Sequence, residues 1–204
     1  MEEINLPVAR ADIAIAPLSL AENTTVLAYL TNLINTVYTK EEGEFWKEGL
    51  FSRCGPEDVR AYILAGQLAI AWRQGSTASQ SPDTADLMGC VRVQMMDQRR
   101  GEFGVLVCDP TFRGAGVGRD LLAFAEDWAR SQGAEVMELE VLCPDGGWEH
   151  DGKARLVAWY ERVGYVLVRV SEVKDEFPWL ADILARPAKV RVYQKPLQLL
   201  AQVL

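Results

Sequence analysis

The sequence predicts a mixed α/β fold organised around two parallel strands that are joined by a helix. Three observations support this prediction. Phe103–Cys108 is an almost continuous apolar run, which is typical of a strand buried on both faces. A glycine-rich turn follows, and the helix after it carries one apolar stripe at Val117, Leu121, Ala125 and Trp128. Val136–Leu142 then alternates as a second strand. A strand–helix–strand unit of this kind gives a parallel pair with a right-handed crossover.

Length and composition bound the class of protein. With 204 residues, the chain is long enough for one good core, and we expect a single domain over residues 1–204. The net charge of −8 at pH 7 argues against nucleic acid as a partner. We expect no membrane association, because no apolar run is long enough to span a bilayer. The acidic start, Met1–Glu3, does not look like a signal peptide.

The cysteines indicate a reducing compartment. The four cysteines show no Cys-x-x-Cys spacing, and this usage is typical of intracellular chains. Cys90 and Cys108 fall inside apolar strand patterns, so we expect both to be buried thiols. From these features we expect a cytoplasmic protein. As to oligomeric state, we expect a monomer or a homodimer.

Hydrophobic spacing and turn residues predict the other elements in chain order. Ahead of the central unit we expect a strand at Ile13–Leu18, a helix at Leu20–Tyr38, a helix that starts after Pro56–Asp58, and strands through Leu68–Trp72 and Leu87–Met96. The connections are a loop at Glu41–Trp46, a flexible loop at Gly75–Asp86, and a hairpin turn at Gln98–Gly101. After the central unit we expect a helix at Lys153–Val163, a strand at Tyr165–Val170, a helical turn around Pro178, and a strand at Lys189–Lys195. Phe45 and Trp46 are expected to be packing residues.

The turn between the two central strands favours an anion site. Its residues 113–118 read Arg-Gly-Ala-Gly-Val-Gly. Glycine has no Cβ and lets a ligand approach the backbone, and the free N–H groups at a helix start attract a phosphate. Arg113 adds a forked cation suited to the same guest. The alternative is a glycine-rich connection that only packs tightly. The spacing fits neither a dinucleotide fingerprint nor a Walker loop.

Two segments carry a resemblance to a known family. The pattern Arg-x-x-Gly-x-Gly, at Arg113, Gly116 and Gly118, resembles motif A of the Gcn5-related N-acetyltransferase (GNAT) superfamily. Trp159–Tyr165 resembles the segment that closes the cofactor site in that family. A looser likeness to fungal GNAT-like acetyltransferases runs from Arg155 onward. The resemblance implies a mostly antiparallel twisted sheet of six to seven strands, with helices on both faces and the parallel pair at the cofactor site.

The same resemblance implies acetyl-CoA as the cosubstrate and an amine as the acceptor. It implies that the turn holds the pyrophosphate and that a backbone amide of the central strand stabilises the oxyanion. Many relatives carry an asparagine shortly before the tyrosine of the closing segment, whereas this chain offers Lys153 or Arg155 as a substitute for that contact. The residues expected at the cofactor are Leu106, Val107, Cys108, Arg113, Gly114, Ala115, Gly116, Val117, Gly118 and Arg119.

Acetyl transfer to an amine needs a neutral amine and a proton for the departing thiolate. Tyr160 matches the tyrosine that acts as general acid in the family; its alternative role is a packed core aromatic. Glu102, at the start of the predicted central strand, is the first candidate for the general base and would act through water. Glu138 and Glu140 on the next strand are rivals. His150 is a further candidate base; as the single histidine it makes a poor metal site, and no metal is expected.

The sequence therefore favours an N-acetyltransferase that acts on a primary amine of a small molecule or a peptide. A competing hypothesis is a GNAT-like module that binds acyl-CoA without turnover, as a sensor or scaffold. A third is a phosphate-binding structural domain unrelated to CoA. The acceptor pocket is expected to be built from four loop segments, Thr39–Phe51, Gly75–Asp86, Pro144–Gly152 and Glu172–Lys189.

Overall fold

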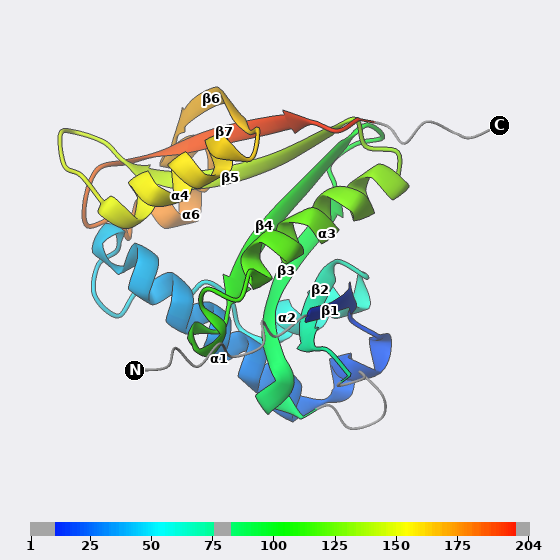
Figure 1. Cartoon of the computed structure of the whole chain (residues 1–204). Coiled ribbons are helices and arrows are strands. Elements are labelled where there is room, and N and C mark those ends of the chain that lie inside the picture. Colours follow the sequence, from blue (N-terminus) through cyan, green and yellow to red (C-terminus); the bar gives the residue numbers. More distant parts are fainter. Residues whose placement is uncertain (1–10, 76–82, 199–204) are drawn as a thin grey trace, which may run out of the picture.

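A seven-stranded sheet forms the centre of the protein in a computed structural model, which describes residues 11–75 and 83–198. The strands lie in the order β1-β2-β3-β4-β5-β7-β6 (Figure 1). Every neighbouring pair is antiparallel except β4–β5, which is parallel. This arrangement confirms the predicted mixed, mostly antiparallel sheet. The strands are β1 Ala11–Ile15, β2 Leu68–Arg73, β3 Leu87–Met95, β4 Arg100–Cys108, β5 Val136–Pro144, β6 Val166–Glu172 and β7 Ala188–Pro196.

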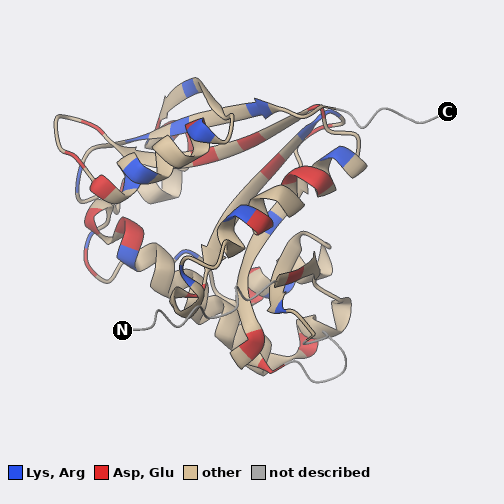
Figure 2. Ribbon diagram, in the orientation of Figure 1, with Lys and Arg blue, Asp and Glu red and all other residues tan. Residues whose placement is uncertain are grey.

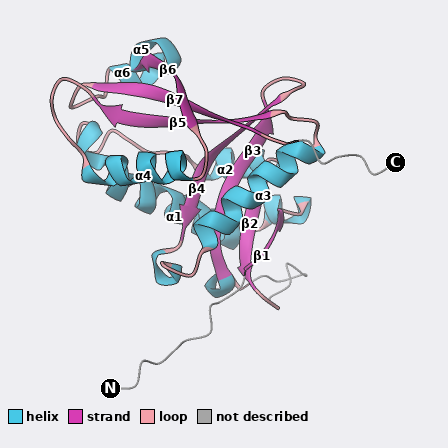
Figure 3. Ribbon diagram, turned by 45° about the horizontal axis from the view of Figure 1, so that its top comes forward, coloured by secondary structure: helices cyan, strands magenta, loops and turns pink. Residues whose placement is uncertain are grey.

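Helices cover both faces of this sheet, as predicted (Figures 1 and 3). One face packs on α1 and α2, through a core that includes Leu30 and Ile63. The other face packs on α3 and α4, where Leu121 and Tyr160 share a core with Phe103. None of the described helices combines the length and the apolar character needed to cross a membrane. The helices are α1 Thr24–Glu42, α2 Pro56–Leu64, α3 Val117–Ser131, α4 Asp151–Arg162, α5 Val173–Glu176 and α6 Pro178–Ala181, with 3-10 turns at Leu18–Glu22, Gly43–Phe45, Thr84–Asp86 and Pro110–Phe112.

The first long helix extends one turn further than predicted. It starts after Asn23, whose side chain accepts a hydrogen bond of 3.1 Å from the Val26 N–H. It ends at Glu42, because Gly43 is the first residue that disfavours a helix. The prediction of a loop from Glu41 was therefore wrong, and Glu41 and Glu42 belong to the last turn of α1.

The central strand also starts earlier than predicted. β4 begins at Arg100, and the Met96 N–H donates to the Arg100 carbonyl at 2.8 Å, which closes the predicted hairpin. Glu102 therefore lies inside β4 rather than at its start. The first strand covers Ala11–Ile15, and a 3-10 turn begins at Leu18. The predicted strand at Ile13–Leu18 was therefore placed too far along the chain. Of the predicted loop at 75–86, residues 76–82 lie outside the described part of the chain.

The parallel strands separate soon after they pair. Within the described chain, Arg100–Glu102 pair with Val136–Glu138, and no pairing of β4 with β5 follows. Beyond this point a register shift in the β3–β4 ladder marks a bulge, in which Val105 has a φ of 50°. A bulge bends the strand that carries it, and a β-branched residue seldom adopts this conformation. The predicted burial of β4 on both faces was wrong, because half-buried residues face a cavity there; they are Gly104, Leu106 and Cys108.

Candidate active site

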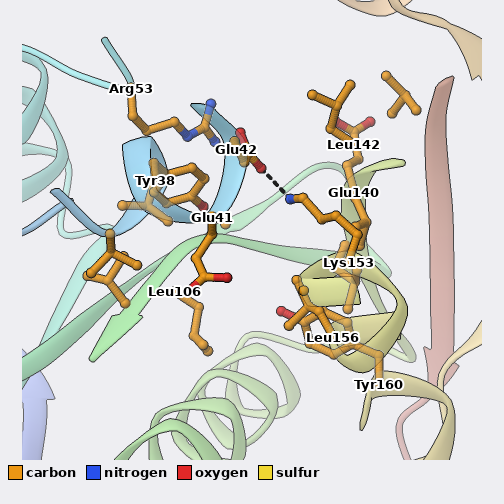
Figure 4. A pocket seen from close by; sticks show the side chains of 18 of the residues that line it. Tyr38, Glu41, Glu42, Arg53, Leu106, Glu140, Leu142, Lys153, Leu156 and Tyr160 are labelled. Atoms are coloured by element: carbon orange, nitrogen blue, oxygen red, sulfur yellow. Dashed lines mark hydrogen bonds and ion pairs between the residues drawn. The ribbon is translucent and has the colours of Figure 1, made fainter. Parts of the chain in front are cut away.

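A cavity of about 480 Å³ opens where β4 and β5 part. The end of α1 and the segment that follows it form one wall, and α4 forms the facing wall (Figure 4). Side chains of α5 and α6 complete the lining. The size is that of a ligand-binding cavity rather than a packing defect. Its charged lining residues are Glu41, Glu42, Arg53, Arg113, Glu140, Lys153 and Arg155.

The glycine turn lies directly beyond Arg113, at the start of α3. Gly114 and Gly116 have φ values of 82° and 85°, so both need the left-handed conformation that favours glycine. Gly118 lies inside α3, where an added Cβ would come within 3.4 Å of the Cys108 sulfur. Two of the three glycines therefore shape the turn, whereas at Gly118 an added Cβ would make only an ordinary contact. The first N–H groups of α3 are left free of intrahelical partners.

The residues expected at the cofactor divide into two groups. The β4 residues expected there line the cavity together with Arg113, whereas the turn and the start of α3 form the segment that follows. Val117 is buried at the first position of α3. Arg119 is exposed and pairs with Asp120 at 3.3 Å. The lining residues of this set are Leu106, Val107, Cys108 and Arg113, and those of the following segment are Gly114, Ala115, Gly116, Val117, Gly118 and Arg119.

A carboxylate at the end of β4 anchors the turn to α1. The Tyr29 hydroxyl donates to Asp109 Oδ2 at 2.6 Å. The Thr111 N–H and hydroxyl donate to Asp109 Oδ1 at 2.8 and 2.6 Å. Burial raises the pKa of Asp109, but these hydrogen bonds outweigh burial and hold the pKa below its ordinary value. The charged Asp109 therefore fixes the path of the chain into the turn.

Two of the cavity's basic residues are already paired with carboxylates of α1. Arg113 Nη2 lies 3.6 Å from Glu41 Oε1. Lys153 Nζ lies 2.5 Å from Glu42 Oε1, and both side chains of this pair are buried (Figure 4). Since Glu42 holds Lys153, Arg155 is the better candidate to replace the missing asparagine of the family pattern. Arg155 is exposed and lines the cavity from α4.

Tyr160 reaches the cavity from α4, and its ring is buried against the sheet. It packs against Phe103 and Tyr165, each with ring centroids 5.9 Å away. The predicted orientation of this ring is therefore confirmed. Burial raises the pKa of the Tyr160 hydroxyl, so the phenol stays protonated at working pH. The hydroxyl has no hydrogen-bond partner among the described residues, although the core-aromatic alternative expects one.

Of the three candidate carboxylates, Glu140 lines the cavity, whereas Glu102 and Glu138 are absent from its described lining. Two acidic residues, Glu138 and Glu140, lie within β5, where Figure 2 shows acidic positions in red. Glu102 accepts a hydrogen bond of 2.7 Å from Gln94. Glu138, its partner across the parallel pair, accepts one of 2.6 Å from Gln194. Burial raises the pKa of Glu140, and repulsion from Glu102 and Glu138 adds to this shift.

His150 caps a helix rather than facing the cavity. Its Nδ1 accepts a hydrogen bond of 3.2 Å from the Lys153 N–H at the start of α4, and its ring stacks on Phe45 with centroids 5.5 Å apart. Cys90 is buried as predicted, but Cys108 is half-buried because it lines the cavity. Burial raises the pKa of Cys108 to about 11. No cluster of three or more potential metal ligands occurs in the described part of the chain.

The expected acceptor loops contribute unequally. Thr39–Phe51 and Glu172–Lys189 both line the cavity, whereas Pro144–Gly152 contributes Gly152 and the described residues of Gly75–Asp86 contribute none. Sequence reasoning missed Arg53, which projects into the cavity from the segment after α1. It belongs to no motif, and the one available signal was its position between two predicted helices.

The family comparison agrees with this geometry. The profile of the acetyltransferase (GNAT) family matches residues 39–165, which is more than half of the chain. The chain belongs to the acetyltransferase (GNAT) family. The matched range includes β4, the glycine turn and Tyr160, so it confirms the resemblance that the turn carried. No curated protein matches the sequence.

Solved structures of this GNAT fold resemble the chain over nearly its whole length. The NatC complex bound to Gag peptide and CoA contains a chain that aligns with a TM-score of 0.61 and 17% identity, over 93% of this chain and 99% of that one. The Salmonella typhimurium protein yncA with acetyl-CoA aligns at 0.60 and 16%, over 94% and 96%. The Escherichia coli ribosomal-protein-S18-alanine N-acetyltransferase aligns at 0.56 and 14%, over 96% and 99%. At these identities the likeness shows a shared fold.

Proposed function

We propose that this protein is an N-acetyltransferase that moves an acetyl group from acetyl-CoA to a primary amine of a small molecule or a peptide. The observation that carries the proposal is one cavity that joins three parts. It begins beside the glycine turn, it contains the Tyr160 hydroxyl, for which the described residues offer no hydrogen-bond partner, and it contains the Glu140 carboxylate. Membership of the acetyltransferase family supports the same reaction class.

The turn fits the pyrophosphate of CoA. Gly114 and Gly116 keep side-chain atoms away from the backbone, and α3 directs free N–H groups toward the same place. Arg113 is 57% exposed along its side chain, so its guanidinium is accessible to a phosphate despite the contact with Glu41. Bound acetyl-CoA would supply the acetyl group as a thioester. Backbone N–H groups of β4 that face the parting from β5 would polarise the acetyl carbonyl.

Two side chains would handle the protons. We infer that Glu140 takes the proton that the amine loses, because it lines the cavity and its raised pKa makes it a stronger base. Glu102 is the alternative base, acting through water as the sequence predicts. Tyr160 would give its proton to the sulfur as the carbon–sulfur bond breaks and the nitrogen–carbon bond forms. The charges balance with an amide and a free thiol as products, and the proton on Glu140 would return through solvent to the Tyr160 phenolate, which restores both side chains.

The test separates an enzyme from a binding module. Purified protein is mixed with acetyl-CoA and a panel of primary amines, and free thiol and acetylated product are both measured. Acetyl-CoA binding is followed separately by the rise in melting temperature that a ligand specific for the folded state causes. We expect binding and product. Binding without product from any amine would support the non-catalytic module, and absence of binding would contradict both.

A further inference from the structure

We propose that the amine acceptor also carries a carboxylate, and that Arg53 binds this carboxylate inside the cavity. The inference rests on the proposed function and deepens it, because it narrows the acceptor to small amino acids.

The pairing of charges in the cavity is incomplete. Arg113 is paired with Glu41, and Lys153 is paired with Glu42. The lining residues that remain are the cations Arg53 and Arg155 and the carboxylate Glu140. Within the described chain, no carboxylate oxygen lies within 4.0 Å of either arginine's nitrogens. An acceptor that pairs with these remaining charges therefore needs a negative group for an arginine as well as an amine for Glu140.

The backbone that carries Arg53 is fixed to α1. Asn35 Oδ1 accepts hydrogen bonds from the N–H groups of Arg53 at 2.8 Å and Cys54 at 3.2 Å. In return, Asn35 Nδ2 donates to the Cys54 carbonyl at 2.8 Å. Ser52 also donates to Asn35 Oδ1, at 3.2 Å. One amide side chain thus holds three consecutive residues and sets where the Arg53 side chain starts.

The guanidinium is held as well. Its central carbon lies 4.9 Å from the centre of the Tyr38 ring, a cation–π geometry that orients the planar fork. Tyr38 itself lines the cavity from α1. Arg53 remains exposed to solvent. Its guanidinium interacts with the Tyr38 hydroxyl and, at longer range, with Glu42. A positioned and exposed guanidinium that has no carboxylate within 4.0 Å in the described chain is suited to bind the carboxylate of a ligand.

The place of Arg53 assigns it to the acceptor rather than to the cofactor. Figure 4 shows Arg53 entering the cavity from the side opposite to Tyr160, while Glu140 projects from β5. Arg155 belongs to α4, the same helix as Tyr160, and so serves the cofactor side. An amino acid would lie with its amine toward Glu140 and its carboxylate at Arg53. The cavity of about 480 Å³ must also admit the acetyl end of the cosubstrate, so the acceptor is small.

The experiment compares amino acids with their neutral counterparts. Wild-type protein is assayed with acetyl-CoA and a graded series of ω-amino acids, starting from glycine, and with the amides of the same compounds. We expect kcat/KM for the best acid to exceed that for its amide by about 10- to 100-fold, the worth of a charge-assisted hydrogen bond. Arg53→Gln should remove this preference by slowing the acid alone, and Arg53→Lys should retain part of it.

A matched control is Arg186→Gln. Arg186 stacks on Trp148 at the same 4.9 Å, but it lies outside the cavity lining, so its replacement should leave the preference for acids unchanged. Binding of the N-acetylated acid in the presence of CoA, followed by melting temperature, gives a readout that does not need turnover. Equal rates for acid and amide, or a preference that survives in Arg53→Gln, would overturn the inference. Failure to bind acetyl-CoA would instead overturn the proposed function.

Discussion

Lys153 Nζ lies 2.5 Å from Glu42 Oε1, and this buried ion pair joins α4 to the last turn of α1 across the cavity. The pair depends on the extra helical turn that ends at Glu42, because this turn carries Glu42 to the cavity. Because Lys153 is engaged by Glu42, Arg155 stays the better candidate for the contact that the family's asparagine makes. The two walls of the cavity are thereby connected by one contact between charged groups.

The first prediction concerns the stability that this pair provides. Lys153→Met should lower the free energy of unfolding by about 3–5 kcal/mol, since it leaves the Glu42 carboxylate buried without a partner. Urea denaturation measures the change. Arg186→Gln, which breaks the exposed pair with Glu44 at 3.1 Å, is the control and should cost less than about 1 kcal/mol. If the two variants lose similar stability, the buried pair does not hold the walls together.

The second prediction concerns the turn. Gly116→Asp places a carboxylate where a pyrophosphate would bind and should abolish the rise in melting temperature caused by acetyl-CoA. Gly147→Asp is the matched control, because Gly147 has a φ of 87° and also lies in a loop, yet it is absent from the cavity lining. Both variants carry a similar backbone strain, so only the first should lose binding. Unchanged binding in folded Gly116→Asp would place the cofactor elsewhere.

The third prediction separates the two candidate bases. Glu140 is protonated as the pH falls through its raised pKa. The rate–pH profile should therefore have an acid limb, in which turnover falls with falling pH. Glu140→Gln should slow turnover about 10²-fold and remove the limb. Glu102→Gln should keep turnover but move the limb to lower pH, since it removes one of the charges that raise the Glu140 pKa. Rate–pH profiles of the two variants give the answer.

Stability provides the control for this pair of variants. A carboxyl group with a raised pKa in the folded state stabilises that state below its unfolded pKa, and the contribution is lost as the pH rises through the folded value. At pH 7 Glu140→Gln should therefore not lower the melting temperature. A profile that loses its acid limb in Glu102→Gln and keeps it in Glu140→Gln would make Glu102 the base.

The central unit was predictable because its signals are local. The apolar run of β4, the glycines with positive φ and the stripe on α3 all lie within one stretch of sequence. The acceptor side was not predictable in the same way. Arg53 lines the cavity from a segment whose backbone Asn35 holds against α1. Glu140 rather than Glu102 lines the cavity because Glu140 lies on β5 beyond Glu102–Glu138, the last pair between β4 and β5. Both features depend on contacts between distant segments, which periodicity does not report.

The last prediction concerns Tyr160 and decides between general acid and core aromatic. Tyr160→Phe keeps the ring against Phe103 and removes only the hydroxyl, which has no partner among the described residues. Turnover should therefore fall about 10²-fold, with acetyl-CoA affinity and the free energy of unfolding nearly unchanged. The matched control is Tyr165→Phe, because the Tyr165 hydroxyl donates to Glu126 at 3.0 Å. That variant should lose about 1 kcal/mol of stability and keep its turnover. Wild-type turnover in Tyr160→Phe would exclude this tyrosine as the proton donor, whatever its effect on stability.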